Sequence, residues 1–245
     1  MKKILILGGT AEARELADAL VAQGHAVTTS LAGRTSDPIL PKGELRVGKF
    51  GGVPGLQAYL KAHGIERLVD ATHPYAALMS TNAVAAAGLT GVPLVRYVRP
   101  GWREPDGAGW VHVPDIPAAA AALPAGATVL VTTGHEGLDA FFRRNDCEIL
   151  VRLIDRPEGP LPAHMELLLA RPPYRLEDEL ALLRRQEITH LVTKNSGGEQ
   201  TRAKLEAAAQ LGVATIMVAR PPLPAAVEAD TLAGVLAALH LEDSA

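Results

Sequence analysis

The stretch with the clearest chemical capacity is a glycine turn near the start of the chain. Four apolar residues, 4–7, lead into Gly8-Gly9-Thr10 and then into an alanine-rich run. This pattern predicts a buried parallel strand, a tight turn and a helix. Thr10 is a favourable N-cap, and Glu12 lies in the first turn, where the helix dipole favours an acid. The turn directs backbone N–H groups at one point, which predicts a phosphate site. A plain turn without a ligand is the alternative.

The end of the next predicted strand, residues 25–31, bears on the choice of dinucleotide. NAD-preferring enzymes place an acid there on the ribose hydroxyls. This chain has Ser30, Gly33 and Arg34 instead. A hydroxyl, free backbone and a guanidinium suit a 2′-phosphate, so the sequence favours NADP(H), although Arg34 could equally be a solvated surface residue. With two later strand ends included, the predicted cofactor residues are Gly8, Gly9, Thr10, Glu12, Ser30, Gly33, Arg34, Gly51, Gly52 and Thr72.

A histidine follows the fourth predicted strand, residues 67–71. The loop reads Thr72-His73-Pro74-Tyr75, and it falls at the carboxyl end of the strand, the edge where open α/β sheets bind ligands. His73 is therefore the candidate catalytic residue, able to donate or accept a proton there. The alternative is a structural histidine that shapes the turn beside Pro74.

The second half of the chain carries a predicted anion nest. Lys194-Asn195-Ser196-Gly197-Gly198 follows a predicted strand and precedes a helix. The lysine, the hydroxyl and the amides suit a phosphate or a substrate carboxylate, and Thr132-Thr133-Gly134 is a weaker version. Several arginines at strand ends suit a ligand with many carboxylates, because bidentate pairing is the strong form. They are Arg96, Arg99, Arg103, Arg152, Arg171 and Arg220. Solvated side chains and surface ion pairs are the alternatives.

The composition limits the class of protein. The chain has 245 residues, of which 48% are hydrophobic, enough for one large or two small domains. A formal net charge of −3 argues against a general nucleic-acid binder. The single cysteine, Cys147, excludes an internal disulfide and a CxxC metal site. The first apolar run is too short for a signal peptide and no run reaches membrane-spanning length, so we expect a cytoplasmic protein without a metal site.

Strands and helices alternate five times in the first hundred residues, which predicts a doubly wound parallel sheet. Residues 101–110 are rich in Gly, Pro and charge and mark a boundary. A second α/β series follows and ends in a predicted helix over residues 225–240. We therefore expect an α/β fold with two Rossmann-like parallel-sheet domains, residues 1–100 and 101–245, that face a cleft.

Two stretches of the chain are similar to each other. Residues 68–100 and 191–221 each read as strand, loop, helix and strand, and each ends in Arg-Pro. This similarity indicates two related sheets. A coincidence of two ordinary βαβ units is the alternative.

Five motifs are spread in order over almost the whole chain. They are Gly8-Gly9-Thr10-Ala11-Glu12, Gly48-Lys49-Phe50-Gly51-Gly52, Asp70-Ala71-Thr72-His73-Pro74-Tyr75-Ala76, Arg96-Tyr97-Val98-Arg99-Pro100-Gly101-Trp102 and Thr193-Lys194-Asn195-Ser196-Gly197-Gly198. The third and the fifth are the most specific. With these motifs the chain resembles the precorrin-6A reductase family of cobalamin biosynthesis, which includes the cobalt-precorrin-6A reductases.

The resemblance implies an NADPH-dependent oxidoreductase that delivers a hydride to one carbon of a tetrapyrrole and a proton to its neighbour. The proton donor is His73, water or a substrate carboxylate. The expected substrate-binding residues are Tyr75, Arg99, Trp102, Thr133, Lys194, Asn195, Ser196 and Gly197. An NADP-dependent reductase of a smaller substrate and a non-catalytic nucleotide-sensing module are the alternatives. Neither a nucleic acid nor a membrane is expected as a partner. The sequence leaves the oligomeric state open and is compatible with a monomer. It also leaves open whether the substrate contains cobalt.

Overall fold

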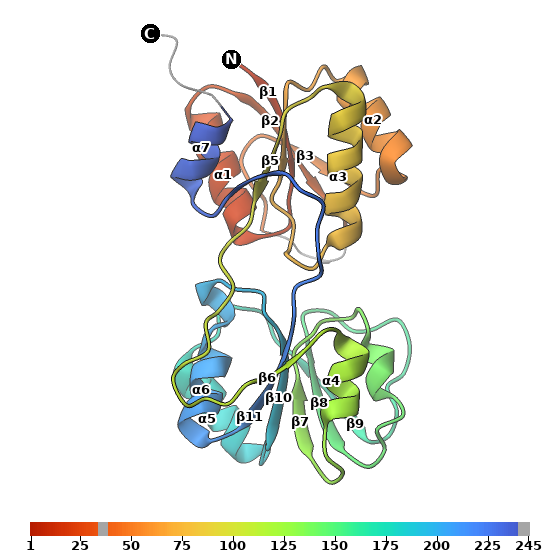
Figure 1. The fold of residues 1–245 in the computed structure, drawn as a ribbon, viewed down its shortest axis with the longest axis vertical. Helices are drawn as coiled ribbons and strands as arrows, with labels where there is room; N and C mark the ends of the chain where they lie inside the picture. The colour runs from red at the N-terminus through yellow and green to blue at the C-terminus, as the bar shows by residue number, and fades with distance from the viewer. Residues whose placement is uncertain (34–38, 240–245) are drawn as a thin grey trace. The chain divides into compact units, whose positions relative to one another are not determined.

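A computed structural model describes residues 1–33 and 39–239. The chain forms two compact units (Figure 1). The first unit comprises Met1–Pro100 together with the described chain after Pro221, and the second unit comprises Gly101–Pro221. Each unit is built on one six-stranded sheet in which all pairs are parallel. The predicted α/β fold with two Rossmann-like parallel sheets is therefore confirmed.

The sheet of the first unit has the order β12-β5-β4-β1-β2-β3. Its strands are β1 (Lys3–Leu7), β2 (Ala26–Leu31), β3 (Glu44–Val47), β4 (Arg67–Asp70), β5 (Leu94–Tyr97) and β12 (Val227–Ala229). Its helices are α1 (Ala11–Ala22), α2 (Gly52–Ala62), α3 (Ala77–Thr90) and α7 (Leu232–Ala238). Helices α1 and α7 cover one face and α2 and α3 the other (Figure 1).

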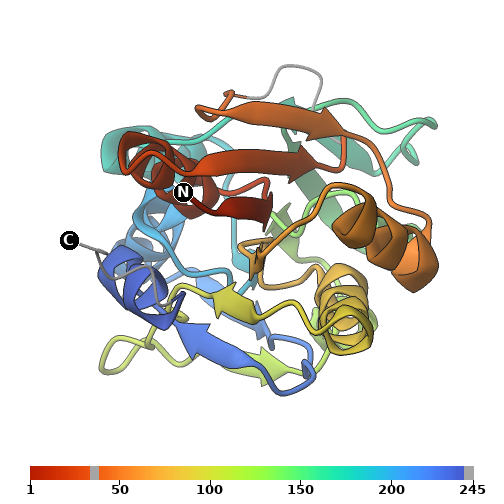
Figure 2. The same cartoon turned by 90° about the horizontal axis from the view of Figure 1, so that it is seen from above.

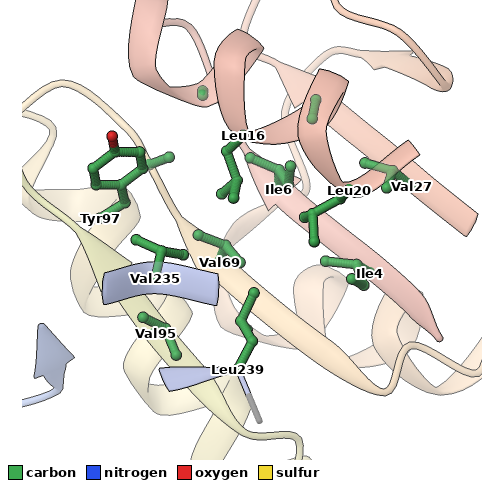
Figure 3. Close-up of a cluster of buried hydrophobic side chains, with 13 residues drawn as sticks. Ile4, Ile6, Leu16, Leu20, Val27, Val69, Val95, Tyr97, Val235 and Leu239 are labelled. Atoms are coloured by element: carbon green, nitrogen blue, oxygen red, sulfur yellow. The ribbon is translucent and has the colours of Figure 1, made fainter. Parts of the chain in front are cut away.

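Both faces of β1 are buried, which explains its unbroken apolar run. Ile4 and Ile6 pack in one cluster with Leu16 of α1, while Leu5 and Leu7 pack in the cluster on the opposite face. Figure 3 shows the first of these clusters, between β1, α1 and α7. Successive strand residues point to opposite faces, so a strand covered on both sides needs apolar residues at every position. Burying each such side chain contributes about 1.5–3 kcal/mol.

The sheet of the second unit has the order β6-β11-β10-β7-β8-β9. Its strands are β6 (Val111–Val113), β7 (Thr128–Val131), β8 (Glu148–Leu153), β9 (Met165–Leu169), β10 (His190–Lys194) and β11 (Ala214–Val218). Its helices are α4 (Ile116–Ala122), α5 (Leu176–Arg185) and α6 (Ala203–Leu211), with short 3₁₀ helices η1 (Leu138–Phe141) and η2 (Glu199–Thr201). In the described chain, no helix combines the length and apolarity needed to cross a membrane.

The chain after Pro221 belongs to the first unit and corrects the predicted second domain of residues 101–245. Strand β12 pairs with β5 (Figure 2), with Val227 opposite Val95. Val235 of α7 is buried in the cluster that contains Leu16. The predicted helix over residues 225–240 is thus a short strand followed by a short helix. A three-residue strand has little local signal, and its partner lies more than a hundred residues earlier in the chain.

The two sheets have equivalent strand orders. The similar stretches, residues 68–100 and 191–221, fall on β4-α3-β5 and β10-α6-β11, and these elements occupy the same positions in the two sheets. The edge strand beside β5 is β12, from the end of the chain, whereas the edge strand beside β11 is β6, which precedes the rest of its sheet. The second unit therefore has the strand order of the first in a permuted chain order, and the predicted relation between the sheets is confirmed at the level of topology.

Candidate functional site

The glycine turn after β1 requires glycine at two positions for different reasons. A Cβ on Gly8 would lie 2.8 Å from Cγ2 of Thr29, so a side chain there would push β2 away. Gly9 has open space but a φ of +110°, which an L side chain rarely adopts. The Gly8 N–H donates to the Ser30 carbonyl at 2.9 Å, which holds the turn on β2. The chain thus leaves β1 sharply and enters α1 at once.

Thr10 caps α1 as predicted and also ties it to β4. Its Oγ1 accepts the N–H of Ala13 at 3.1 Å and donates to the carbonyl of Ala71 at 2.9 Å. The first N–H groups of a helix have no intrahelical acceptor, and the cap takes only one of them. The remaining N–H groups and the positive helix end lie at the carboxyl edge of the first sheet, where they suit a phosphate.

A pocket adjoins this turn within the first unit. Arg99 Nη1 contacts both carboxylate oxygens of Glu12, at 3.0 and 2.8 Å. Burial, followed by the charges of Glu15 and Glu12, raises the pKa of Tyr97, so its hydroxyl stays protonated and can donate a hydrogen bond. Arg99, predicted to bind substrate, thus neutralises the acid at the helix start. The residues lining the pocket are Thr10, Glu12, Thr72, Pro74, Tyr97 and Arg99.

A buried ion pair positions the loop after β4. Asp70 Oδ1 accepts the N–H of Thr72 at 3.2 Å and its hydroxyl at 2.7 Å. Asp70 Oδ2 accepts Nε–H of Arg96 at 3.4 Å, and Arg96 Nη1 donates to Glu228 of β12 at 2.7 Å. Asp70 and Arg96 are 1% and 3% exposed. Reasoning from the sequence missed this role of Asp70, for which the only signal was an acid at the end of a buried strand.

His73 lies half-buried in the same loop. Its Nδ1 accepts the N–H of Tyr75 at 3.3 Å, so the proton of the neutral imidazole is on Nε2. The two rings are 5.7 Å apart between centroids. The loop therefore fixes the orientation of the ring while leaving a proton on the nitrogen that faces away from the Tyr75 amide.

The remaining predicted cofactor residues of the first unit also follow parallel strands. Ser30 is buried near the end of β2, Gly33 follows that strand, and Gly51 and Gly52 form the start of α2. Arg34 lies outside the described residues. Because parallel strands end at one edge of a sheet, these residues share the edge that carries the glycine turn.

In the second unit, hydrogen bonds join the loop after β10 to the segment that precedes β6. Asn195 Oδ1 accepts the N–H of Trp102 at 2.7 Å, and Asn195 Nδ2 donates to the Trp102 carbonyl at 3.3 Å. The indole N–H of Trp102 donates to the Gly198 carbonyl at 3.1 Å, and the Lys204 ammonium lies 4.7 Å from its ring centre. Asn195 and Trp102, both predicted to bind substrate, therefore hold this loop in shape. Lys194, at the end of β10, is 8% exposed.

Arg220 holds the same loop from its other side. Its Nε donates to the Asn195 carbonyl at 2.8 Å and its Nη2 to the Ser196 carbonyl at 3.2 Å. The Ser196 N–H donates to the Lys194 carbonyl at 2.7 Å, and Gly197 has a φ of +69°. The predicted anion nest is thus hydrogen-bonded to Trp102 and Arg220, which lie near the first and last residues of the second unit.

A second buried ion pair lies at the β8 end of this sheet. Arg152 Nη1 and Glu179 Oε1 are 2.5 Å apart, and both side chains are 3% exposed. The Arg152 guanidinium also lies 4.0 Å from the ring centre of Tyr174. Arg152 therefore makes an internal ion pair, as Arg96 does, and Arg220 donates to loop carbonyls. Thr133, after β7, is buried, and its hydroxyl has no partner among the described residues.

Two all-parallel sheets, each with polar loops at the carboxyl ends of its strands, define an α/β protein of the nucleotide-binding type. The glycine turn and the capped start of α1 give the first sheet an edge that suits a phosphate. The chain belongs to the family described as "Precorrin-6x reductase CbiJ/CobK", whose model matches residues 3–240. Membership of a reductase family implies a nicotinamide cofactor. The resemblance found in the sequence is confirmed.

Individual relatives match nearly the whole chain. A precorrin-6A reductase of Rhodococcus erythropolis is 48% identical over 240 residues, which cover 97% of each chain. A cobalt-precorrin-6A reductase of Priestia megaterium is 30% identical over 235 residues, covering 90% of this chain and 91% of that one. A solved structure described as "CobK precorrin-6A reductase" matches with a TM-score of 0.93 at 45% identity, covering 98% of this chain and 96% of that one.

Proposed function

We propose that this protein reduces precorrin-6A, or its cobalt-containing form, to the 6B dihydro form in cobalamin biosynthesis, with NADPH as the reductant. The similarity to named precorrin-6A reductases over nearly the full length of the chain carries this assignment. The geometry of the two sheet edges supports it. When bound, the nicotinamide supplies the hydride, and the protein supplies binding, orientation and a proton.

The first unit is the proposed cofactor-binding unit. The N–H groups at the start of α1 face the turn formed by Gly8 and Gly9, and they suit the pyrophosphate. Glu12 would repel that group, but its ion pair with Arg99 neutralises it. Thr72, oriented by Asp70, and the glycines that open α2 complete the proposed set.

The second unit is the proposed tetrapyrrole-binding unit. The substrate bears several carboxylates, which pair with cations and with N–H or O–H donors. Lys194, Ser196 and Gly197 supply an ammonium, a hydroxyl and backbone N–H groups on one loop. The buried Thr133 hydroxyl, which lacks a partner among the described residues, adds a donor after a neighbouring strand. Tyr75 remains a proposed substrate contact of the first unit.

His73 is the proposed proton donor. With Nδ1 accepting from the Tyr75 amide, Nε2 is the nitrogen that carries the proton to be transferred. A positioned general acid contributes about 100- to 10,000-fold to a rate. Water and a substrate carboxylate are the competing donors. Replacement of His73 distinguishes a histidine donor from these two.

The decisive experiment is an anaerobic incubation of the purified protein with precorrin-6A and NADPH, and in parallel with NADH, followed by mass spectrometry of the tetrapyrrole. We expect a product heavier by one hydride and one proton, with NADPH preferred. Equal turnover with NADH would keep the reductase and refute the NADPH preference. Tight NADPH binding without product, from either the metal-free or the cobalt-containing substrate, would favour a reductase of a smaller substrate.

A further inference from the structure

An arginine on the edge strand of the first sheet lies directly beside the end of β2. Arg46 of β3 is opposite Ser30 of β2 in the parallel register. Its Nη1 donates to Ser30 Oγ at 3.2 Å and to the Gly48 carbonyl at 2.6 Å, and its Nη2 donates to the Lys49 carbonyl at 3.0 Å. The guanidinium is therefore fixed at the strand end where dinucleotide-binding sheets contact the adenosine ribose.

Aromatic packing fixes the plane of this guanidinium. Its central carbon lies 3.7 Å from the ring centre of Phe50 and 5.4 Å from that of Tyr59. These two rings meet edge to face, with their centres 5.3 Å apart. Stacking on an aromatic ring restricts a long side chain, so Arg46 is held in place before any ligand arrives.

The charge of Arg46 is not balanced by a carboxylate in the part of the chain that the structure describes: none of the ion pairs found there includes it. Arginine has five N–H groups. Three donate to the acceptors above. Among the residues that the structure describes, one N–H on Nε and one on Nη2 have no acceptor. Two adjacent N–H donors on a fixed cation suit a phosphate monoester, which accepts such pairs bidentately.

We propose that Arg46 binds the 2′-phosphate of NADPH and, together with the Ser30 hydroxyl, sets the preference for NADPH over NADH. This inference rests on the proposed cofactor site of the first unit. Arg46 thus takes the role of 2′-phosphate ligand that the sequence predicted for Arg34. The end of β2 has no acid to contact the ribose hydroxyls of NADH, whereas a cation and a hydroxyl lie side by side at that strand end.

The test is equilibrium binding without turnover. Isothermal titration with 2′,5′-ADP and with 5′-ADP isolates the contribution of the 2′-phosphate. The variants are Arg46→Met, which keeps the apolar stem, and Arg46→Lys, which keeps the charge. The control is Arg67→Met, because Arg67 also donates to backbone carbonyls, those of Leu239 and Glu66, but lies at the amino end of β4.

We expect the wild-type protein to bind 2′,5′-ADP more tightly than 5′-ADP. Arg46→Met should weaken 2′,5′-ADP binding by about 10- to 100-fold, the range for a charge-assisted hydrogen-bonded pair, and change 5′-ADP binding by no more than about twofold. Arg46→Lys should retain part of the preference, because an ammonium attracts the phosphate without the bidentate geometry. Arg67→Met should retain all of it.

Equal weakening of both probes by Arg46→Met would overturn the proposal, since Arg46 would then only hold the loop. If that variant does not fold, Arg46→Lys decides, and a preference as strong as in the wild type would overturn the bidentate contact. A wild-type protein that binds both probes equally would refute both the NADPH preference and the role of Arg46. Product formation with NADH in the tetrapyrrole assay would still leave the reductase assignment standing.

Discussion

The two sheets have equivalent strand orders but different chemistry at equivalent positions. In the first sheet, the register places Asp70 of β4 opposite Arg96 of β5, and the two form a buried ion pair. In the second sheet, the corresponding strands place Thr193 of β10 opposite Met217 of β11, a neutral pair. One residue further along, Lys194 stands in β10, whereas Ala71 follows β4. At these equivalent positions the first sheet thus has a cation paired with a carboxylate, and the second sheet has its cation, Lys194, one residue later at the end of β10.

The connections after the central strands differ as well. Strand β1 leads through a glycine turn into the 12-residue helix α1, whereas β7 leads into the four-residue η1. The sequence predicts a helix to about Arg144 at the latter place. The structure has one 3₁₀ turn there instead, Leu138–Phe141, which buries Leu138 and Phe141. A long helix N-terminus suits a pyrophosphate, and a lysine with hydroxyls suits carboxylates. The proposed division of ligands therefore rests on the loops, because the strand order of the two sheets is the same.

The largest expected effect concerns the loop after β4, which carries His73 where the loop after β10 carries only small and polar residues. We expect His73→Ala to lower kcat by about 100- to 10,000-fold. NADPH affinity should stay unchanged, because the His73 ring is not part of the glycine turn. Steady-state turnover and NADPH fluorescence titration measure the two quantities. The control is His112→Ala, which removes an exposed ring from β6 of the second unit. Nearly full turnover in His73→Ala would exclude this side chain as the acid.

The next largest effect is a loss of stability when either of the two buried ion pairs is broken. Glu179→Gln should lower the free energy of unfolding by about 3–5 kcal/mol, because Arg152 would stay buried without another described carboxylate partner. Asp70→Asn should cost less, because Arg96 keeps Glu228. Urea denaturation followed by circular dichroism measures the loss in both variants. The fluorescence of Trp102 and Trp110 reports separately on the second unit, which contains Glu179. Equal losses in the two variants would contradict this ranking.

A third prediction separates the ligands of the two units. Lys194→Met should raise the KM for the tetrapyrrole by about 10- to 100-fold through loss of a charge-assisted contact, with NADPH affinity unchanged. Gly8→Ala should weaken NADPH affinity and leave the KM for the tetrapyrrole unchanged, because the added methyl group would meet Thr29 and displace the glycine turn. Initial rates at varied tetrapyrrole and cofactor concentrations give both constants. A loss of NADPH affinity in Lys194→Met would contradict the division of ligands between the units.

The smallest effect is a pH dependence of stability. Burial lowers the pKa of His190 in β10, so the folded state binds its proton less readily than the unfolded state, whose imidazole titrates near pH 6.5. The resulting stabilisation is present above that pH and is lost as the pH falls below it. His190→Gln should therefore lose less stability than the wild type between about pH 7.5 and about pH 5.5. Urea midpoints at the two values measure this, and parallel losses would refute it.

The sequence by itself determined the family and those local elements that have a clear periodic or capping signal. The apolar run of β1, the Thr10 cap and the glycine turn are written in neighbouring residues, because strand and helix periodicity and capping act over a few positions. The similarity of residues 68–100 to 191–221 likewise indicated two related sheets. The five motifs identified the family, which the full-length relatives confirm.

Only the tertiary structure decided which side chains meet. Arg96 and Glu228 are 132 residues apart in the chain, and Asn195 and Trp102 are 93 apart. Strand β12 joins the first sheet for the same reason: its partner is chosen by packing, not by its three residues. Arg46 became the candidate phosphate ligand only when the β2–β3 register placed it beside Ser30. Hydrogen bonds and ion pairs between distant residues leave no periodic signal in a single sequence, so their pairing requires the fold.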